Sequence, residues 1–492
     1  MGIDLHLNVR DYGAKGDGVA NDTSAIQAAL NDAVKGIGTV VLLPFGTYRI
    51  TAALTITGGN RIFVEGDGSV IQGGREDLFR VQDTANFQVS HLTYDTPTTQ
   101  GVARFFRGIR ITNATLFDCH MKNGALAYFL GTYDGDPIDY TDKTFWNSFI
   151  RLEKCTATGS YLVDNLVMCQ KTNNIVIDQC LLEKGTGDGV KFNGGDSENL
   201  YLTHNEIRYM TGDGVDMFGS GRYLHINDNY FHHVRGYPAN LKLSGDQANQ
   251  DGSTFKAWFV NNRVENNALG LGLANGKNIL VQGNIFKQNG VDPVDGTKYS
   301  HMIMVDESAE DIRFIDNDFF QNDTKQAVIS LEQMGQGMNL YTLVQGNRFR
   351  GNTAPALISI GKSESTANRM IDIEGNLFDT MTGRAVQVQI NRGSVAIKNN
   401  RFLNGPEAIR ISTLGVNAEV VVAGNKSEVS GAPLVNSTTS AQVEHDNSWN
   451  YPLFGPTSKR PLYPYLGQQY YDTTLGRLMY CRSITPRQWT AL

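Results

Sequence analysis

Two segments of this 492-residue chain carry nearly the same string of glycines and carboxylates. Thr-Gly-Asp-Gly-Val at positions 186–190 recurs at positions 211–215, so Asp213 follows Asp188 by 25 positions. If successive coils stack with this period, Asp213 lies beside Asp188, and Asp216 lies beside Lys191. Like charges one strand apart raise the pKa of one of them, as a general acid and its carboxylate partner require. We therefore interpret Asp213, Asp216 and Asp188 as candidate catalytic residues.

Paired carboxylates cleave glycosidic bonds, and they stand ~5–5.5 Å apart in retaining enzymes and ~6.5–9.5 Å apart in inverting ones. Asp188 and Asp213, at one strand spacing, fall near the first distance. Asp213 and Asp216 would be ~10 Å apart along a straight strand, and closer if the turn at Gly212–Gly214 bends it, which suits inversion. The alternative for both Gly-Asp-Gly strings is turn chemistry, in which the Asp binds backbone amides. Asp216 lies mid-strand, where Asp is disfavoured, and this favours a functional role.

Further polar residues near these strings are candidates for binding a substrate. We expect Lys242 to lie beyond Asp216 on the next coil, and Arg235 to pair with Asp213 or to hold an anionic sugar. His232 has an alternative interpretation as a solvated histidine at a turn. The substrate-binding candidates are Lys191, Arg235, Tyr237, Lys242, His232, Tyr133 and Trp146. Lys191, Lys242, Arg235 and Tyr237 would also supply the base and the charge-neutralising site of a β-elimination, so a lyase remains an alternative.

Long insertions interrupt the repeats at 131–148, 244–256 and 291–300. The first combines aromatic residues, Tyr133 and Trp146 among them, with several carboxylates. It predicts either a wall of a saccharide groove or a contact between subunits. A second polar cluster, with a weaker signal, contains His301, Asp306, Glu307 and Glu332.

These residues are set in a repeat that predicts a stacked architecture. An apolar residue, a spacer, an apolar residue, two spacers, an Asn or Cys, a spacer and another apolar residue recur mostly every 22 to 33 positions. Repeats of this size with strand-like units indicate a β solenoid, in which each coil packs on its neighbours. Stacked Asn amides can bond to their copies one strand spacing away, with the Asn itself in the left-handed conformation of a tight turn. The Asn/Cys column consists of Cys119, Cys155, Cys180, Asn205, Asn229, Asn262, Asn284, Asn317, Asn347, Asn376, Asn400 and Asn425.

Composition excludes several classes of partner. The 43 Lys and Arg against 50 Asp and Glu give a net charge of −7, which disfavours nucleic acid. No apolar run approaches the ~18–20 residues that span a bilayer, and the N-terminus lacks the pattern of a secretory signal. No pair among the five cysteines has Cys-x-x-Cys spacing, so we expect buried free thiols, no metal site and no cofactor.

The N-terminal tenth of the chain predicts a cap. Asp22 is positioned as the N-cap of a helix that buries Ile26, Ala29, Leu30 and Ala33, and this helix would cover the first coil. Residues 9–18 (Val-Arg-Asp-Tyr-Gly-Ala-Lys-Gly-Asp-Gly), 21–30 and 43–48 (Leu-Pro-Phe-Gly-Thr-Tyr) closely resemble the start of the pectate-lyase-like superfamily. That resemblance implies a right-handed parallel β-helix acting on a polysaccharide. Lyases, hydrolases and epimerases of this superfamily all carry the motif, so it does not specify the reaction.

The C-terminal segment has a different pattern. Positions 467–480 predict a hairpin, with Asp472–Gly476 as the turn between two aromatic strands. This segment resembles a small module of bacteriophage tail spikes and tail fibres. The resemblance implies a homotrimer in the virion tail, outside the host cell, that contacts other tail proteins and a bacterial surface polysaccharide. Such proteins often carry an N-terminal virion-binding domain, and here the cap begins near Met1.

Together these patterns predict an all-β chain. Residues 1–50 form the N-terminal cap with its helix, 51–447 a right-handed parallel β-helix, and 448–492 a small C-terminal β module. The predicted function is a tail-spike-like depolymerase that hydrolyses capsular or exopolysaccharide. The alternatives are a polysaccharide lyase, a non-catalytic polysaccharide-binding adhesin and a purely structural virion protein. The epimerases of the superfamily carry a Tyr-Gly-Phe-Asp-Pro-His motif, and the similar string at 134–139 lacks its Tyr and His.

Overall fold

The computed structural model describes residues 5–97, 103–130, 146–159, 165–193, 197–218, 221–242, 256–333, 339–361, 368–437, 447–449, 454–455, 457–459, 469–484 and 487–491.

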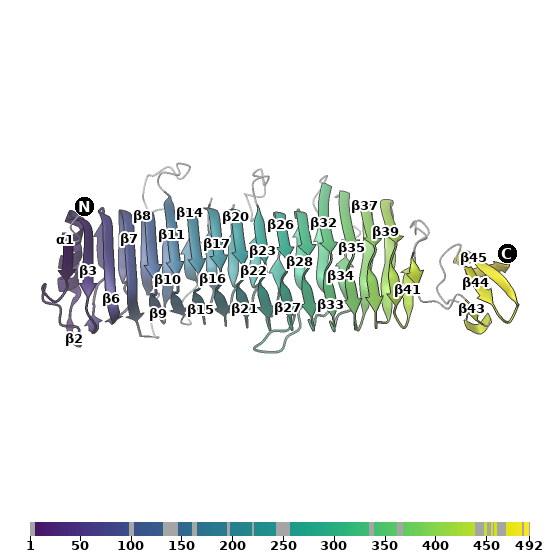
Figure 1. The fold of residues 1–492 in the computed structure, drawn as a ribbon, viewed down its shortest axis with the longest axis horizontal. Helices are drawn as coiled ribbons and strands as arrows, with labels where there is room; N and C mark the ends of the chain where they lie inside the picture. Colours follow the sequence, from purple (N-terminus) through teal and green to yellow (C-terminus); the bar gives the residue numbers. More distant parts are fainter. Residues whose placement is uncertain are drawn as a thin grey trace. The chain divides into compact units, whose positions relative to one another are not determined.

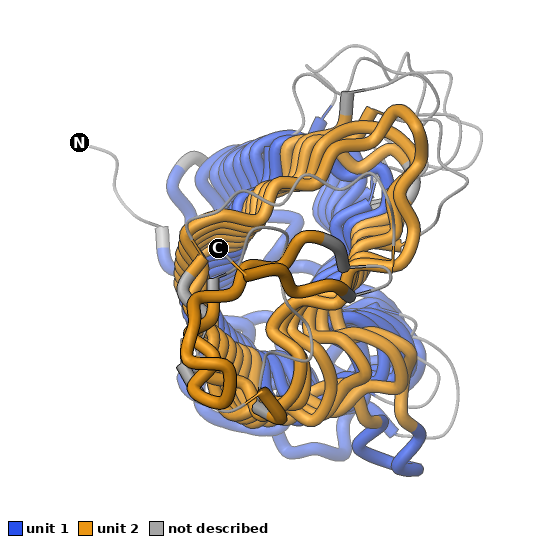
Figure 2. Tube along the Cα trace, turned by 90° about the vertical axis from the view of Figure 1, so that its right-hand side faces the viewer, with its two compact units in different colours: residues 1–280, 292–297 blue, residues 281–291, 298–492 orange. Residues whose placement is uncertain are grey.

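The fold is an all-β parallel solenoid of about 14 turns, with one short helix among the described residues and a small C-terminal sheet (Figure 1). The predicted solenoid is therefore confirmed. Two compact units are distinguished, residues 1–280 with 292–297, and residues 281–291 with 298–492. Within each unit, successive coils superpose when they are viewed end-on (Figure 2).

Each full coil of the first unit contributes one strand to each of three parallel sheets, which we call faces 1, 2 and 3 in chain order. Face 1 contains β1 (Leu5–Asn8), β3 (Ile37–Leu43), β11 (Asn147–Glu153), β14 (Thr172–Asp178), β17 (Ser197–Thr203), β20 (Gly221–Asn227) and β23 (Ala257–Val260). Face 2 contains β2 (Asp17–Asn21), β4 (Thr47–Arg49), β9 (His120–Lys122), β12 (Thr156–Thr158), β15 (Leu181–Glu183), β18 (Glu206–Arg208), β21 (Tyr230–His232) and β24 (Arg263–Glu265). Face 3 contains β5 (Leu54–Thr57), β10 (Ala125–Leu130), β13 (Asn165–Cys169), β16 (Asp188–Asn193), β19 (Val215–Phe218), β22 (Ala239–Lys242) and β25 (Leu271–Gly272).

Three long strands turn corners and so take part in more than one face: β6 (Asn60–Gln72), β7 (Phe79–Asp95) and β8 (Arg104–Phe117). The border between the units falls within β26 (Lys277–Gln282).

The second unit has the same three-faced coil. Its strands are β27 (Ile285–Lys287), β28 (His301–Glu307), β29 (Glu310–Ile315), β30 (Asp318–Phe320), β31 (Ala327–Gln333), β32 (Asn339–Gln345), β33 (Arg348–Arg350), β34 (Ala356–Ile360), β35 (Asn368–Glu374), β36 (Leu377–Asp379), β37 (Arg384–Lys398), β38 (Arg401–Leu403), β39 (Glu407–Ala423), β40 (Lys426–Glu428), β41 (Ala432–Asn436) and β42 (Ser448–Trp449). Its interior holds a ladder of stacked rings with centroids 4.5 to 5.1 Å apart, namely Phe286, Phe319, Phe349, Phe378 and Phe402.

The C-terminal sheet consists of β43 (Phe454–Gly455), β44 (Gln469–Asp472), β45 (Arg477–Ile484) and β46 (Arg487–Ala491), and a short 3₁₀ turn (Thr457–Lys459) precedes β44. β44 and β45 pair antiparallel, with Asp472 opposite Arg477. The predicted hairpin is confirmed at its predicted turn.

The helix α1 (Thr23–Lys35) packs against β3 and β5 and buries the predicted residues Ile26, Ala29, Leu30 and Ala33. Asp22 occupies the N-cap position, but its carboxylate accepts hydrogen bonds from the backbone N–H groups of Lys15 and Gly16, at 2.6 and 3.1 Å. The predicted N-cap position is therefore confirmed, although the Asp22 carboxylate makes no hydrogen bond to the helix. The carboxylate instead closes the entry turn ahead of the helix.

The Asn column forms buried hydrogen-bonded ladders. Asn205 Nδ2 donates to Asn229 Oδ1 at 2.9 Å, and the backbone N–H of Asn205 donates to the same oxygen at 2.9 Å. The other Nδ2 hydrogen goes to the Ile177 carbonyl at 2.8 Å, so each amide is satisfied inside the coil. In the second unit the same bonds link Asn284, Asn317, Asn347, Asn376, Asn400, Asn425 and Asn447. The structural role predicted for this column is confirmed.

The left-handed residue at this corner is not the Asn but the residue before it. The residues before the column all have φ between 51° and 68°, namely Asp118, Lys154, Gln179, His204, Asp228, Asn261, Gly283, Asp316, Gly346, Gly375, Asn399 and Gly424. The positive φ turns the chain so that the following Asn or Cys points inward, and this explains the four glycines at these corners. The predicted left-handed Asn is therefore wrong by one position.

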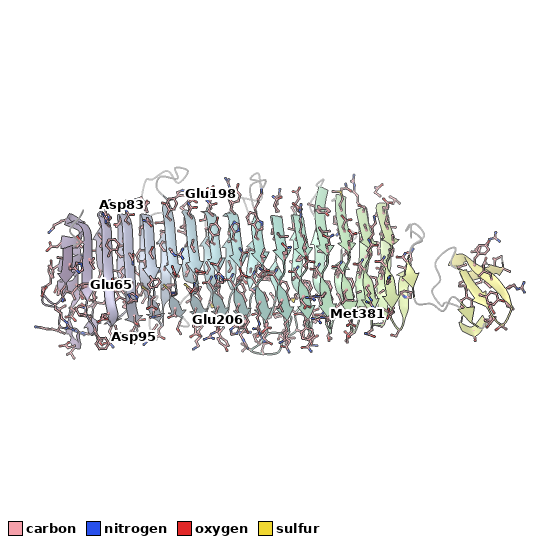
Figure 3. The ribbon with its side chains drawn as sticks, viewed as in Figure 1. Glu65, Asp83, Asp95, Glu198, Glu206 and Met381 are labelled. Atoms are coloured by element: carbon pink, nitrogen blue, oxygen red, sulfur yellow. The ribbon has the colours of Figure 1, made fainter. Side chains whose placement is uncertain are left out.

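The outward positions carry charged pairs, as Asp83 with Arg110 (2.6 Å) and Glu198 with Arg222 (3.5 Å) illustrate (Figure 3). All five cysteines are buried thiols, as expected. No helix in the described ranges is long and apolar enough to cross a membrane.

We predict that Asn347→Ala lowers the free energy of unfolding by about 3 kcal/mol. Asn317 loses the oxygen that accepts both its backbone N–H and its Nδ2, and the Phe314 carbonyl loses its donor. Calorimetry or denaturant unfolding measures the change. Asn447→Ala, at the partly exposed last rung, is the control and should cost less. Equal losses for the two variants would contradict a cooperative internal ladder.

Candidate active site

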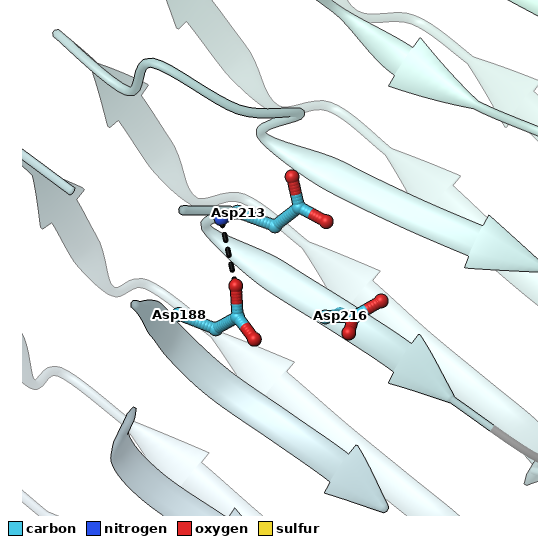
Figure 4. A group of neighbouring side chains, drawn as sticks. All are labelled: Asp188, Asp213 and Asp216. Atoms are coloured by element: carbon cyan, nitrogen blue, oxygen red, sulfur yellow. Dashed lines mark hydrogen bonds between the residues drawn. The ribbon is translucent and has the colours of Figure 1, made fainter. Parts of the chain in front are cut away.

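Corners of the coil bring the three acidic candidates together on face 3. Asp188 begins β16, Asp216 is the second residue of β19, and Asp213 lies on the turn that leads into β19 (Figure 4). The register pairs Lys191 with Asp216, and the Gly189 N–H donates to the Asp213 carbonyl at 2.9 Å. The neighbours predicted from the 25-residue offset are therefore confirmed.

The glycines around these aspartates make room for the carboxylate of the preceding coil. A Cβ on Gly212 would lie 2.6 Å from Asp188 Oδ1, and a Cβ on Gly236 would lie 2.3 Å from Asp213 Oδ1. Both distances are shorter than a real contact allows, so only glycine fits at these two positions.

Backbone amides of the next coil hold two of the carboxylates. Asp188 Oδ1 accepts the Asp213 N–H at 2.8 Å, and Asp213 Oδ1 accepts the Tyr237 N–H at 2.7 Å. Asp213 Oδ2 also accepts a hydrogen bond from Asn240 Nδ2 at 2.9 Å. The amide binding that the turn interpretation predicts is thus present, and it orients the same carboxylates that the catalytic interpretation needs.

Lys191 forms ion pairs with Asp188 and Asp216. Its ammonium lies 2.9 Å from Asp188 Oδ2 and 2.8 Å from Asp216 Oδ2. Asp216 is only 4% exposed, and its second oxygen lies 3.4 Å from Lys242 Nζ. Burial by itself would lower the pKa of Lys191, but its hydrogen bonds to Asp216 and Asp188 raise that pKa above the ordinary value. Lys191 is therefore a fixed cation.

Asp213 has a raised pKa. Burial raises the pKa of Asp213 to about 6, against the opposing effect of the hydrogen bonds from Asn240 and Tyr237. The charges of Asp188 and Asp216 raise it further. The site thus combines one carboxyl that holds its proton in mildly acidic solution with two carboxylates that face a lysine.

The three carboxylates are closer than a straight strand would place them. One oxygen of each lies within 4.8 Å of one oxygen of the others, whereas Asp213 and Asp216 on a straight strand would be ~10 Å apart. Carboxylates so arranged are potential ligands for a hard cation. The Lys191 ammonium already lies between Asp188 and Asp216, so an ion there would have to displace it.

The structure corrects the register expected for Lys242. Asn240 lies beside Asp216, whereas Lys242 pairs with Phe218 and reaches Asp216 only through its long side chain. The 24-residue offset from Asn205 to Asn229 would have placed Asn240 there. Asn240, which bonds to Asp213, is the site residue that the sequence analysis missed.

The remaining candidates lie around this centre or away from it. Tyr237 contributes its backbone N–H to Asp213. Arg235 pairs with Asp292 and Asp295 of the third insertion, at 2.8 and 3.0 Å. His232 lies on face 2, where it is buried with Nε2 3.0 Å from Glu206 Oε1, so the solvated-turn interpretation is wrong for it.

Trp146 is buried, with Lys171 Nζ 5.4 Å from its ring centroid. Tyr133, the string at 134–139 and most of the first two insertions lie outside the described residues.

Two family models match parts of the chain. Residues 6–128 match a model described as rhamnogalacturonase A/epimerase, pectate lyase-like, and residues 247–447 match a right-handed β-helix region. The first match is to a pectate-lyase-like model and the second to a right-handed β-helix, and both agree with the resemblance of the N-terminal motif and with the parallel coils described above.

Named relatives match shorter stretches. The chain is 37% identical over 108 residues to mannuronan C5-epimerase AlgE2 of Azotobacter vinelandii, which covers 18% of this chain and 11% of that protein. It is 35% identical over 98 residues to alginate lyase 7 of the same organism, with the same coverage. It thus spans about a tenth of the length of these relatives. Among solved structures, it is similar to tailspike protein 3 of bacteriophage CBA120, with a TM-score of 0.43 and 12% identity over 99% of this chain and 68% of that one.

We predict that Asp213→Asn stabilises the protein at pH 8 and not at pH 4. The raised pKa means that the folded state keeps its proton more tightly than the unfolded state, so stability is lost as the pH rises through about 6. Asn carries no charge and avoids this loss, which is on the order of 2–3 kcal/mol. Thermal unfolding at the two pH values measures the difference.

Asp216→Asn is the matched control for this test. It should destabilise the protein at pH 8, because Lys191 and Lys242 both lose the negative charge of the Asp216 carboxylate with which they pair. Equal destabilisation by both variants at pH 8 would contradict the assigned difference in protonation.

Proposed function

We propose that the chain hydrolyses glycosidic bonds of a bacterial capsular or exopolysaccharide, with Asp213 as the general acid and Asp188 or Asp216 as its carboxylate partner. One observation carries this proposal. A carboxyl group whose pKa is raised to about 6 lies within 4.8 Å of two carboxylates that are paired with one lysine. Opposite protonation of neighbouring carboxyl groups is what acid-assisted cleavage requires.

In this reaction Asp213 gives its proton to the glycosidic oxygen as the bond to the anomeric carbon breaks. The partner carboxylate faces the positive charge that develops on the sugar ring. Water then supplies a hydroxyl to the anomeric carbon, and its remaining proton passes to a carboxylate of the site. Asn240 and the Tyr237 N–H hold the Asp213 carboxyl in place through this cycle.

A polysaccharide lyase is the second candidate, and the similarity to an alginate lyase and to mannuronan epimerases favours it. Its base must be unprotonated to remove a proton from the sugar. The ion pairs that raise the pKa of Lys191 make it unsuitable for this role, and Arg235 is engaged by Asp292 and Asp295. Lys242 and the Tyr237 hydroxyl remain as candidate bases. We rank hydrolysis first because the raised pKa of Asp213 supplies a proton donor for it.

The setting that we propose is the tail of a bacteriophage, outside the host cell, with other tail proteins as partners. The C-terminal hairpin, which resembles a tail-spike module, supports this proposal. We predict a homotrimer, so light scattering on purified protein should give three times the chain mass of 54.2 kDa. A monomer at micromolar concentration would contradict this prediction.

We predict that Asp213→Asn lowers the cleavage rate by about 10²–10⁴-fold, because the leaving oxygen loses its proton donor. The wild-type rate should fall as the pH rises above about 6, where Asp213 ionises, and the variant should lack this limb. New reducing ends, released from a panel of purified bacterial polysaccharides that includes alginate, measure the rate.

Asp83→Asn, which alters an exposed pair with Arg110, is the control and should retain the wild-type rate. An unchanged rate in Asp213→Asn would refute the assignment. A product that absorbs near 235 nm would identify a lyase instead, and binding without cleavage would identify an adhesin.

A further inference from the structure

A cavity of about 870 Å³ lies on the first coils, at the corner between faces 1 and 2. β6 passes through this corner and contributes Asp67 and Glu65, which Figure 3 labels near the N-terminal end of the solenoid. His91 of β7 and His120 of β9 also line the cavity. Its volume lies within the range of ~300–1,000 Å³ that is usual for ligand pockets. All of its lining residues belong to the first unit.

The corner carries polar groups on its outer side. His91 and Asp118 have left-handed φ angles of 55° and 51°, and each of them precedes a fully buried residue, Leu92 or Cys119. The two outer side chains line the cavity, whereas the two that follow them fill the interior. The turn that directs the Cys and Asn column inward therefore also places these polar groups outside.

The carboxylates that line the cavity can accept hydrogen bonds from a ligand. Within the described residues, Glu65, Asp67 and Asp118 accept none from the protein, although ring nitrogens lie near two of them. His120 Nε2 lies 3.3 Å from Asp118 Oδ1, and His91 Nε2 lies 3.9 Å from Asp118 Oδ2. His91 Nδ1 lies 3.6 Å from Glu65 Oε1. These distances exceed those of ordinary hydrogen bonds, so the carboxylates do not hold the coils together.

Two contacts fix the histidine rings. His120 Nδ1 shares a hydrogen bond with Thr156 Oγ1 at 2.9 Å, and the His91 ring packs edge-on against Phe117 with centroids 5.6 Å apart. Ring nitrogens supply donors and acceptors beside the carboxylates. Groups that are already held in place lose little entropy when a ligand binds to them.

The charge of the cavity limits the ligand that it can take. Three carboxylates line it, and none of its lining residues is Lys or Arg. Elsewhere in the first unit outward carboxylates pair with arginines, as Asp83 with Arg110 illustrates. A sugar that carries a carboxylate or sulfate would meet like charges here. Sugar hydroxyl and ammonium groups instead donate strong hydrogen bonds to carboxylates, and Val40 and Leu42 contribute apolar surface for a sugar ring.

We propose that this cavity is a second carbohydrate-binding site, which takes sugar residues that carry hydroxyl or ammonium groups and no negative charge. The choice of a carbohydrate rests on the proposed function. The cavity performs no chemistry; it retains the polymer on the first coils between cleavage events at Asp213. The polymer therefore contains an uncharged or amino sugar in its repeating unit.

Calorimetric titration with defined hexasaccharides tests the proposal. The probes are hexamers of glucose, galactose, mannose, glucosamine and galacturonate, titrated into Asp213→Asn to prevent turnover. We expect an uncharged or amino hexamer to bind in the cavity, and the galacturonate hexamer to bind there at least about tenfold more weakly because like charges repel. Adding Thr93→Trp, which places a bulky ring in the cavity, should abolish this binding and leave binding on face 3 in place.

Two further variants separate the cavity from general effects of charge. Asp118→Asn removes one carboxylate of the cavity and should weaken binding at least about fivefold. Asp228→Asn is the matched control, because Asp228 occupies the same left-handed corner position, with φ 59°, and does not line the cavity. It should leave binding unchanged. Thermal unfolding identifies a variant that fails to fold, and if Thr93→Trp does so, Asp118→Asn decides the result.

Binding that survives both Thr93→Trp and Asp118→Asn, a cavity that prefers the galacturonate hexamer, or no binding by any uncharged or amino hexamer would overturn the site. A preference for glucosamine supports it and identifies the ammonium group as the one recognised. Cavity-dependent binding by a wild-type protein that cleaves nothing supports the site and refutes the hydrolysis. Cleavage that Asp213→Asn abolishes, without any cavity-dependent binding, leaves the proposed hydrolysis standing and overturns the site.

Discussion

The buried asparagine ladder fixes the register from coil to coil, and the outward chemistry depends on that register. The backbone N–H and the Nδ2 of Asn205 both donate to Asn229 Oδ1 of the next coil, and Nδ2 also donates to the Ile177 carbonyl of the preceding coil. A shift by one residue would leave these buried donors and acceptors unpaired. Such a shift would also turn every outward side chain inward. The interior bonds therefore place Lys191 beside Asp216, although none of them touches either residue.

Because the register is fixed, carboxylates on adjacent coils repel one another, and the site contains two arrangements that accommodate this repulsion. Strands stand about 4.8 Å apart, so carboxylates on adjacent coils repel one another at a distance the fold cannot enlarge. Lys191 removes the repulsion between Asp188 and Asp216 by bonding to both. Asp213 turns its oxygens to Tyr237 and Asn240 instead. Burial raises its pKa, and the charges of Asp188 and Asp216 raise it further. Lys191 bonds to Asp188 and Asp216, whereas the hydrogen bonds to Asp213 come from a backbone N–H and an amide.

The parts of the structure that repeat were predictable from the sequence, and the parts that depend on local exceptions were not. The column from Asn205 to Asn425 repeats one residue pattern, and Asp188 and Asp213 lie in a repeated string, so their positions could be read directly. Lys242 was misplaced because its register depends on the length of the local coil, and the pairing of Asp216 with Asn240 gives that coil 24 residues. A second buried ladder, Asn289, Asn322 and Asn352, was also missed, although each follows a column Asn by five residues. Helix-capping propensity gave the position of Asp22 but not the partners of its carboxylate, which are the backbone N–H groups of Lys15 and Gly16.

The same regular spacing suggests why a solenoid suits a long polymer. A polysaccharide presents a similar group at each repeat, and face 3 presents an outward position at each coil. Most of those positions do no chemistry, as Met168 between Tyr128 and Lys191 illustrates. In this row Arg80 and Arg107 lie on early coils, and Lys191 and Asp216 lie further along. Because the interior fixes the register, the separation of the two groups is set by the number of coils between them. Insertion or loss of one coil would change that separation by about 4.8 Å without disturbing either group, and this is how a chain of this fold can adjust to a different repeating unit.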